Sequence, residues 1–220
     1  MKPVVAVIAH PDDEAFGPAG TLAQLAQTRE VYLICVTNGE EGQNNSSKKE
    51  PLTEIRHNEL LESAKVLGIK KVFFLGFQDG TLSNNVYHKV ADKIRTILTE
   101  LEPEIVITNE LHGVSGHLDH IAVSFITSYV CQKLSFISEV WYFCLLADRM
   151  PRITDYFVYF PKGYSTDQIN KTVDISSVWS QKIQAMQKHE SQKQDMARVL
   201  EVFQTLPLED HFIVVRQVNL

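Results

Sequence analysis

Short apolar runs alternate with longer amphipathic segments through the first part of the chain. Four runs have the length of a strand and few polar positions, which predicts strands buried on both faces. These runs are residues 4–9, 31–37, 72–75 and 105–108. Segments with the apolar spacing of helices follow them, at residues 19–27, 53–67, 86–101 and 119–133. The alternation predicts the α/β fold class, with a Rossmann-like parallel sheet and helices on both faces.

The regular alternation ends near residue 133, and additional C-terminal strands and helices are expected beyond it. Further apolar runs predict strands at residues 140–146, 156–160 and 212–215. Helical spacing covers residues 176–189 and 195–203. The chain has no linker rich in Gly, Ser or Pro and no internal repeat, so we expect one domain spanning residues 1–220.

Several local signals mark where the expected helices begin and end. Thr53 is a candidate N-cap for the helix over residues 53–67, Gly68 follows its last turn, and Pro103 ends the next helix. The polar segment at residues 39–51 is unusually long for a connection. It is read either as a mobile flap over a site or as a solvated loop.

Composition and charge exclude several classes of function. The net charge of −6 argues against nucleic acid as a partner, because proteins that bind it usually present a basic face. Cys35, Cys131 and Cys144 lie far apart in apolar runs, as reduced, buried thiols do. The longest apolar region, residues 121–147, is interrupted by charges, which argues against a membrane span. The N-terminal apolar run is too short for a signal peptide, so we expect a cytoplasmic protein.

Residues that could carry chemistry follow the expected strands. In an open α/β sheet, ligands bind beyond the carboxyl ends of the strands, so these positions should meet at one edge. The candidates are His10, Asp12, Asp13, Asn38, Glu40, Gln78, Asp79, Asn109, Glu110, His112, His117, Asp119 and His120.

Three consecutive acids, Asp12, Asp13 and Glu14, stand close to His10, and a second cluster reads His117-Leu118-Asp119-His120. Two histidines and one carboxylate around a divalent cation leave one position open for water, as in catalytic zinc sites. The cation would offset the crowded negative charge, and an aspartate left over beside it could act as a general base. Each cluster alone has a simpler explanation, because acids suit helix N-termini and Asp119 is a good N-cap.

The segments AHPDDE, at residues 9–14, and GHLDH, at residues 116–120, together resemble a known family. They are similar to the zinc-dependent N-deacetylases related to N-acetylglucosaminyl-phosphatidylinositol deacetylase, the PIG-L or LmbE-like family. TNGEEG at residues 37–42, the helix at residues 54–68 and KIQAMQKHESQ at residues 182–192 extend the resemblance over most of the chain.

The resemblance implies a role for each residue of the two clusters. It implies His10, Asp13 and His120 as zinc ligands and Asp12 as the general base. It also implies that His117 stabilises the oxyanion or donates a proton, oriented by Asp119. Two positions depart from the family pattern, with leucine at 118 in place of proline and glutamine at 78 in place of arginine.

Arg56 and Asp79 are the candidates for substrate binding. Arg56 falls in the first turn of its expected helix, where a cation opposes the helix dipole, so a ligand could account for it. An ion pair with an acid such as Glu59 or Glu40 accounts for it equally well. Asp79 could recognise a sugar hydroxyl or simply belong to the turn before Gly80. Without the resemblance, His189 reads as a core or surface histidine.

The leading hypothesis is a zinc-dependent amide hydrolase that removes the acetyl group from an N-acetylglucosamine-type sugar or conjugate. One alternative is a non-haem Fe(II) oxygenase, which uses the same ligand types but usually on a jelly-roll fold. The other is a non-catalytic metal-dependent sugar-binding protein, which would not need Asp12. GxGxxG, P-loop and GxSxG motifs are absent from the sequence. The expected partner is a small N-acetylated sugar, and a homo-oligomer stays open.

Overall fold

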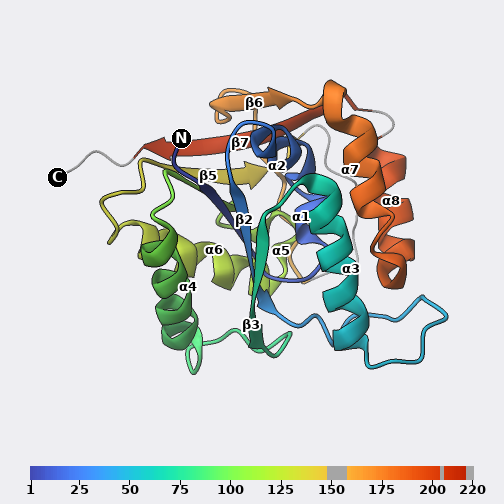
Figure 1. Cartoon of the computed structure of the whole chain (residues 1–220). Helices are drawn as coiled ribbons and strands as arrows, with labels where there is room; N and C mark the ends of the chain where they lie inside the picture. The colour runs from blue at the N-terminus through green and yellow to red at the C-terminus, as the bar shows by residue number, and fades with distance from the viewer. Residues whose placement is uncertain (148–157, 204–205, 217–220) are drawn as a thin grey trace.

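A computed structural model describes residues 1–147, 158–203 and 206–216. Its strands form one seven-stranded sheet in the order β3-β2-β1-β4-β5-β7-β6. The strand bounds are β1 (Val4–Ile8), β2 (Val31–Thr37), β3 (Lys71–Phe77), β4 (Ile105–Asn109), β5 (Glu139–Cys144), β6 (Lys171–Asp174) and β7 (Glu209–Arg216). Figure 1 shows the twisted sheet between two groups of helices.

The first five strands run parallel, and the alternating pattern predicts this for the first four. β1 pairs with β2 on one side, with Val5 opposite Tyr32, and with β4 on the other, with Val5 opposite Val106. The chain winds outward through β2 and β3, then returns across the sheet to β4 and β5. The order therefore reverses between β1 and β4, and this reversal point is where open α/β sheets bind their ligands.

The C-terminal part of the sheet differs from the parallel part. β7 is antiparallel to β5, and β6 is antiparallel to β7 at the edge. The strands expected at residues 140–146 and 212–215 are present, whereas β6 has too few apolar residues to stand out in the sequence. Of the strand expected at 156–160, residues 156–157 lie outside the described residues, and residues 158–160 are not in a strand.

Helices cover both faces of the sheet (Figure 1). Their bounds are α1 (Asp13–Phe16), α2 (Ala19–Ala26), α3 (Leu52–Leu67), α4 (Tyr87–Leu101), α5 (Gly113–Gly116), α6 (Leu118–Cys131), α7 (Trp179–Met186) and α8 (Lys193–Phe203), with 3₁₀ turns η2 (Ser176–Val178) and η3 (Glu190–Gln192). Val4, Ala6 and Ile8 of β1 belong to the core with α2, α3 and α7, while Val5 and Val7 belong to the core with α4 and α6. Alternate side chains of a strand face opposite ways, so β1 is buried on both faces.

Two helix boundaries differ from the sequence signals. α3 begins at Leu52 with Pro51 as its N-cap residue, so Thr53 is not the cap. Proline can precede a helix because its missing N–H would have no partner in the first turn. Gly68 ends α3 with φ 76°, as predicted, because glycine adopts this left-handed conformation easily. The helix expected over residues 176–189 is divided into η2, α7 and a turn before η3.

The three cysteines are buried and free, as their apolar surroundings predict. Within the described ranges, the structure contains no helix with both the length and the apolar character needed to cross a bilayer.

Candidate metal and catalytic site

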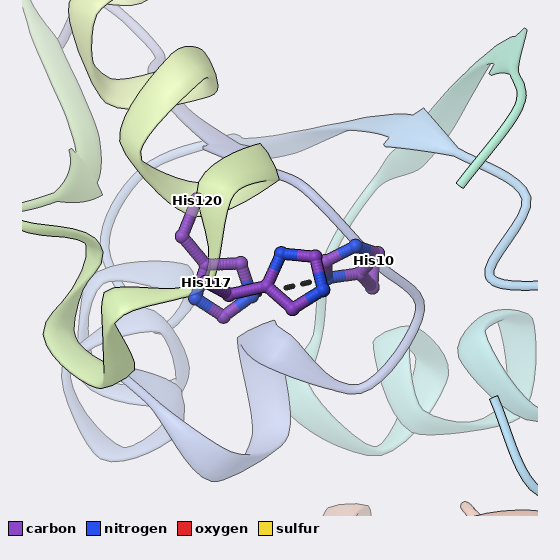
Figure 2. A group of neighbouring side chains, drawn as sticks. All are labelled: His10, His117 and His120. Carbon is purple, nitrogen blue, oxygen red and sulfur yellow. Dashed lines mark hydrogen bonds between the residues drawn. The ribbon is translucent and has the colours of Figure 1, made fainter. Parts of the chain in front are cut away.

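The candidate site lies where β1 and β4 end side by side. His10 lies two residues after the end of β1, while His117 and His120 lie at the start of α6, after β4 and the short α5. Figure 2 shows the three imidazole rings gathered at this point, although more than 100 residues separate His10 from the other two. The ring centroid of His10 is 4.6 Å from that of His117 and 5.0 Å from that of His120. The prediction that the two clusters share one sheet edge is thus confirmed.

His10 and His120 direct ring nitrogens at each other. Nδ1 of His10 is 3.0 Å from Nε2 of His120 (dashed in Figure 2). The other nitrogen of His120, Nδ1, is 3.0 Å from the carbonyl oxygen of Gly113. A carbonyl only accepts, so this contact places the proton of neutral His120 on Nδ1 and leaves the Nε2 lone pair facing the site.

The two carboxylate oxygens of Asp13 each face one of these two nitrogens. Its Oδ1 is 3.1 Å from Nε2 of His120, and its Oδ2 is 3.8 Å from Nδ1 of His10. Oδ2 also accepts hydrogen bonds from the backbone N–H groups of Ala9 and His10, at 3.0 and 2.9 Å. Burial by itself would raise the pKa of Asp13, but His120 and His10 hold it well below its usual range. The carboxylate is therefore rigidly placed and ionised.

Two of these three contacts have the spacing of ligands around a small tetrahedral metal ion. Zinc bonds of about 2.0–2.1 Å at tetrahedral angles separate neighbouring ligand atoms by about 3.3 Å. The distances from His120 Nε2 to His10 Nδ1 and to Asp13 Oδ1, 3.0 and 3.1 Å, lie near that value, whereas His10 Nδ1 is 3.8 Å from the other oxygen of Asp13, Oδ2. Among the described residues, two groups have ligand atoms that all lie within 4.8 Å of one another, namely His10 with His117 and His120, and His10 with Asp79 and Asp119; the expected ligand Asp13 belongs to neither group.

Two more carboxylates stand behind His10. Nε2 of His10 is 3.0 Å from Oδ1 of Asp79 and 3.5 Å from Oδ2 of Asp119. Burial lowers the pKa of His10, but hydrogen bonding to Asp119 and Asp79 and the charge of Asp13 outweigh it and raise this pKa to about 10. A carboxylate behind a histidine is the usual support for a metal ligand, because it orients the ring and increases its basicity. The carboxylates around His10 favour a positive charge at this position, and a bound cation would provide it.

Asp12 has surroundings quite different from those of its neighbour Asp13. Its Oδ2 is 3.0 Å from Nη2 of Arg56, and its backbone has the unusual φ of 131°. Burial raises the pKa of Asp12 to about 6, with the charge of Asp13 adding to the rise and that of Arg56 opposing it. A carboxyl group with a pKa near the working pH is suited to take up and release a proton. Two adjacent acids thus have separate contacts and different proton affinities.

Arg56 is buried, and its guanidinium joins three segments of the site. It donates to the carbonyl oxygens of Gly39 and Pro11, at 2.7 and 2.6 Å, in addition to its ion pair with Asp12. The acids that the sequence offered as partners contact other groups: Glu59 accepts from Ser191, and Glu40 accepts from the N–H of Asp79. The structure therefore pairs Arg56 with Asp12 and places it in the second turn of α3.

His117 begins α6 as its N-cap residue, so Asp119 is not the N-cap. Nδ1 of His117 accepts the backbone N–H of Asp119 at 3.0 Å. Burial, followed by the charges of His10 and His120, lowers the pKa of His117 to about 4. The ring is therefore neutral near pH 7 and carries its proton on Nε2. The carboxylate of Asp119 accepts the N–H groups of Gly80 and Leu82, at 2.7 and 3.2 Å, and so links α6 to the loop after β3.

The polar segment at residues 39–51 is attached to the C-terminal part of the chain. The backbone N–H of Asn45 donates to the carbonyl oxygen of Ser191 at 2.9 Å, and Nε2 of Gln192 donates to the carbonyl oxygen of Gln43 at 2.8 Å. A β-carbon added at Gly39 or Gly42 would lie 2.6 Å from the Arg56 guanidinium. The loop therefore packs closely against the site.

The partners of two buried charged residues are missed by reasoning from the sequence. Glu14 is fully buried and contacts both Ser63 and His189, which are distant in the chain. Lys182 is also buried and pairs with Asp210 at 3.0 Å. The available signals were a third acid beside Asp12 and Asp13 and a lysine within an apolar helical segment. Neither signal names the partner.

Comparison with known proteins extends the similarity beyond the motifs. The family model described as PIG-L, GlcNAc-PI de-N-acetylase, matches residues 5–131. A Bacillus cereus protein named "Probable N-acetyl-alpha-D-glucosaminyl L-malate deacetylase 2" is 39% identical over 125 residues, covering 54% of this chain and 56% of that protein. The protein of the same name from Bacillus anthracis is 30% identical over 197 residues, covering 86% of this chain and 80% of that protein.

Solved structures show that the likeness includes the C-terminal part. N,N'-diacetylchitobiose deacetylase from Pyrococcus horikoshii has a TM-score of 0.76 at 23% identity, covering 98% of this chain and 84% of that one. GalB, a 4-carboxy-2-hydroxymuconate hydratase from Pseudomonas putida, has a TM-score of 0.71 at 18% identity, covering 100% and 98%. These two likenesses concern the fold alone, which carries both reactions. The family match covers more than half of the sequence and contains every predicted metal ligand, so the chain belongs to the PIG-L family.

Proposed function

We propose that this protein is a zinc-dependent amide hydrolase that removes the acetyl group from an N-acetylglucosamine-type sugar or conjugate. Deacetylases of the PIG-L family depend on a metal ion, and the relatives named above are deacetylases of N-acetylglucosaminyl compounds. The observation that carries the proposal is the convergence of His10 Nδ1, His120 Nε2 and the carboxylate of Asp13 beside the separate carboxylate of Asp12.

In this proposal His10, Asp13 and His120 hold the zinc ion. A divalent ion held there supplies polarisation of the acetyl carbonyl and acidification of a water molecule. Asp12 takes a proton from the attacking water as the water oxygen bonds to the carbonyl carbon. The same carboxyl group then gives that proton to the sugar nitrogen as the C–N bond breaks, which yields acetate and a free amine.

His117 contributes a hydrogen-bond donor to the same step. Because its Nδ1 accepts a backbone N–H, its neutral ring presents Nε2–H. In the proposed role this N–H points to the carbonyl oxygen, where negative charge develops, and a fixed donor costs little reorganisation there. Asp119 supports this arrangement by fixing the start of α6 against Gly80 and Leu82.

Arg56 and Asp79 are proposed to bind the substrate at the edge of this site. Arg56 is 4% exposed and Asp79 is 7% exposed, so each could offer only a small surface to a sugar. Their contacts with Asp12 and His10 also support a second contribution, which is to keep the base and a metal ligand in place.

The test is release of free amine from a panel of N-acetylglucosamine derivatives by zinc-loaded protein, followed by chelation and restoration of zinc. We expect turnover of at least one derivative, loss of turnover on chelation, and about one zinc ion per chain. Oxygen consumption with Fe(II) in place of amine release would favour the oxygenase. Sugar binding without turnover would favour the non-catalytic binder. Either result would overturn the hydrolase proposal.

A further inference from the structure

Glu14 is a third acid at the site, and neither the metal nor the substrate accounts for it. Its side chain is fully buried, although a carboxylate is rarely buried without partners. One oxygen, Oε1, accepts from Ser63 Oγ at 2.5 Å and lies 2.7 Å from Nε2 of His189. The other oxygen, Oε2, accepts the backbone N–H of Asp12 at 3.1 Å.

The hydrogen bond to Asp12 acts on a residue whose backbone is strained. Asp12 has φ 131° and ψ −23°, a conformation that side chains other than glycine rarely adopt. Such strain persists only where the surrounding structure determines it, and it is concentrated at functional sites. The carbonyl oxygen of Asp12 accepts the N–H groups of Ala15 and Phe16, each at 2.9 Å. With Glu14 holding its N–H, the residue is fixed on both sides of its α-carbon.

This fixation determines where the Asp12 side chain points. The angle φ is a rotation about the bond between N and Cα, so holding the N–H and the carbonyl together sets the direction of Cβ. In the observed conformation, the Asp12 carboxylate meets Arg56 and stays away from His120, which Asp13 contacts. An Asp12 with an ordinary φ would direct its carboxylate elsewhere.

The group that holds Glu14 comes from both halves of the chain. Ser63 belongs to α3, whereas His189 lies just before η3 and is itself fully buried. His189 also lies outside residues 5–131, which the family model matches. Burial lowers the pKa of His189, but Glu14 outweighs it and raises this pKa, so Nε2 of His189 carries a proton and donates to Oε1 of Glu14 at 2.7 Å.

We propose that Glu14, held by His189 and Ser63, is a positioning residue that keeps Asp12 in its strained conformation and so aims the catalytic carboxylate. The expected effect of Glu14 on the rate rests on the proposed function, whereas its expected effect on the backbone conformation of Asp12 does not. A purely structural link between α1, α3 and η3 would require the bonds to Ser63 and His189 alone. The bond from Asp12 is the additional contact that a positioning role requires.

The informative substitution is Glu14→Gln, studied in the zinc-loaded full chain. Ser63 and His189 both donate to the position of Oε1, so the amide oxygen of the new glutamine should take that position. Its NH₂ group then takes the position of Oε2 and faces the backbone N–H of Asp12, so that two donors oppose each other. Ser63→Ala is a milder second variant that keeps the charge. Asp210→Asn is the matched control, because Asp210 is equally buried and bonded, to Lys182 and Thr21, but has no contact with Asp12.

We expect Glu14→Gln to lower kcat on the order of 10-fold to 100-fold, with KM within about threefold and the zinc content unchanged. Ser63→Ala should give a smaller loss, and Asp210→Asn should lose thermal stability while keeping kcat within about twofold. Crystal structures of the variants provide a readout that needs no activity. Asp12 should leave its positive φ in Glu14→Gln and keep it in Asp210→Asn.

Two results would overturn the inference. One is a Glu14→Gln variant that keeps the positive φ of Asp12 and wild-type kcat. The other is a loss of kcat in Asp210→Asn as large as that in Glu14→Gln, which would indicate general destabilisation. Failure of the wild-type protein to hydrolyse any N-acetyl sugar would refute the proposed function instead, and the crystal structures would still decide whether Glu14 positions Asp12.

Discussion

The adjacent aspartates Asp12 and Asp13 provide the sharpest test of the proposed chemistry. Substitution of each by asparagine keeps the shape of the side chain and removes one negative charge. Asparagine is also preferred to alanine at position 12, because Asp and Asn tolerate positive φ better than most residues. The two variants should fail in different ways, since Asp12 contacts Arg56 whereas Asp13 contacts His120 and two backbone N–H groups.

For Asp12→Asn we expect bound zinc to be retained and the rate to fall on the order of 10²–10⁴, the usual contribution of a positioned general base. At about 1.36 kcal/mol for each factor of ten, this is about 2.7–5.4 kcal/mol of transition-state stabilisation. The cost in folding stability should be smaller, about 1–3 kcal/mol, because Arg56 keeps its bonds to Gly39 and Pro11 when it loses the charged partner.

For Asp13→Asn we expect zinc itself to be lost. The two backbone N–H donors require the amide oxygen at the position of Oδ2, so the amide NH₂ replaces Oδ1 and points at His120. An NH₂ group cannot bind a cation, and its hydrogens oppose one. The zinc content should fall below about a tenth of an equivalent under conditions that load the wild-type protein.

The assay measures zinc by elemental analysis and amine release on the same preparation of each variant, with unfolding midpoints as the control for folding. Loss of zinc from Asp12→Asn together with retention in Asp13→Asn would show that the assigned roles are reversed. If both variants kept zinc and activity, the HPDD segment would be only a turn, and the roles proposed for Asp12 and Asp13 would be wrong.

Two further predictions concern buried groups around the site. Arg56→Lys should lower kcat/KM at least about tenfold with unchanged zinc content, because one ammonium group cannot reach all three acceptors of the guanidinium; steady-state kinetics with wild-type values would contradict this. Burial lowers the pKa of His189, but Glu14 outweighs it and raises this pKa above its usual value. The ion pair therefore stabilises the fold fully below about pH 6.5, which is the pKa of histidine in the unfolded chain. This stabilisation is lost as the pH rises through the pKa of His189 in the folded protein. Urea unfolding should therefore show a larger advantage of wild type over His189→Gln at pH 6 than at pH 9, and an equal or reversed difference would refute the charged pair.

Much of the architecture can be read from the sequence because it depends on local patterns. The apolar runs at β1, β2 and β4 have no room for a solvent-exposed face, so they predict buried parallel strands with helices between them. The motif residues His10 and His120 follow two such strands, and this placement brings them to one sheet edge whatever the details of packing. Gly68 likewise predicts the end of α3, because glycine readily adopts the left-handed conformation that ends a helix.

Other features depend on contacts that no local pattern contains. The antiparallel edge strand β6 is stabilised by pairing with β7, not by apolar residues of its own. The partner of Arg56 was chosen by the way α3 packs beside the turn after β1, which brought Asp12 within reach and left Glu59 to Ser191. Which residue types meet at the sheet edge follows from the local pattern of strands and motifs. That Asp12 and Asp13 face different partners follows from packing, because it depends on a strained φ held by Glu14, whose own partner His189 lies 175 residues away.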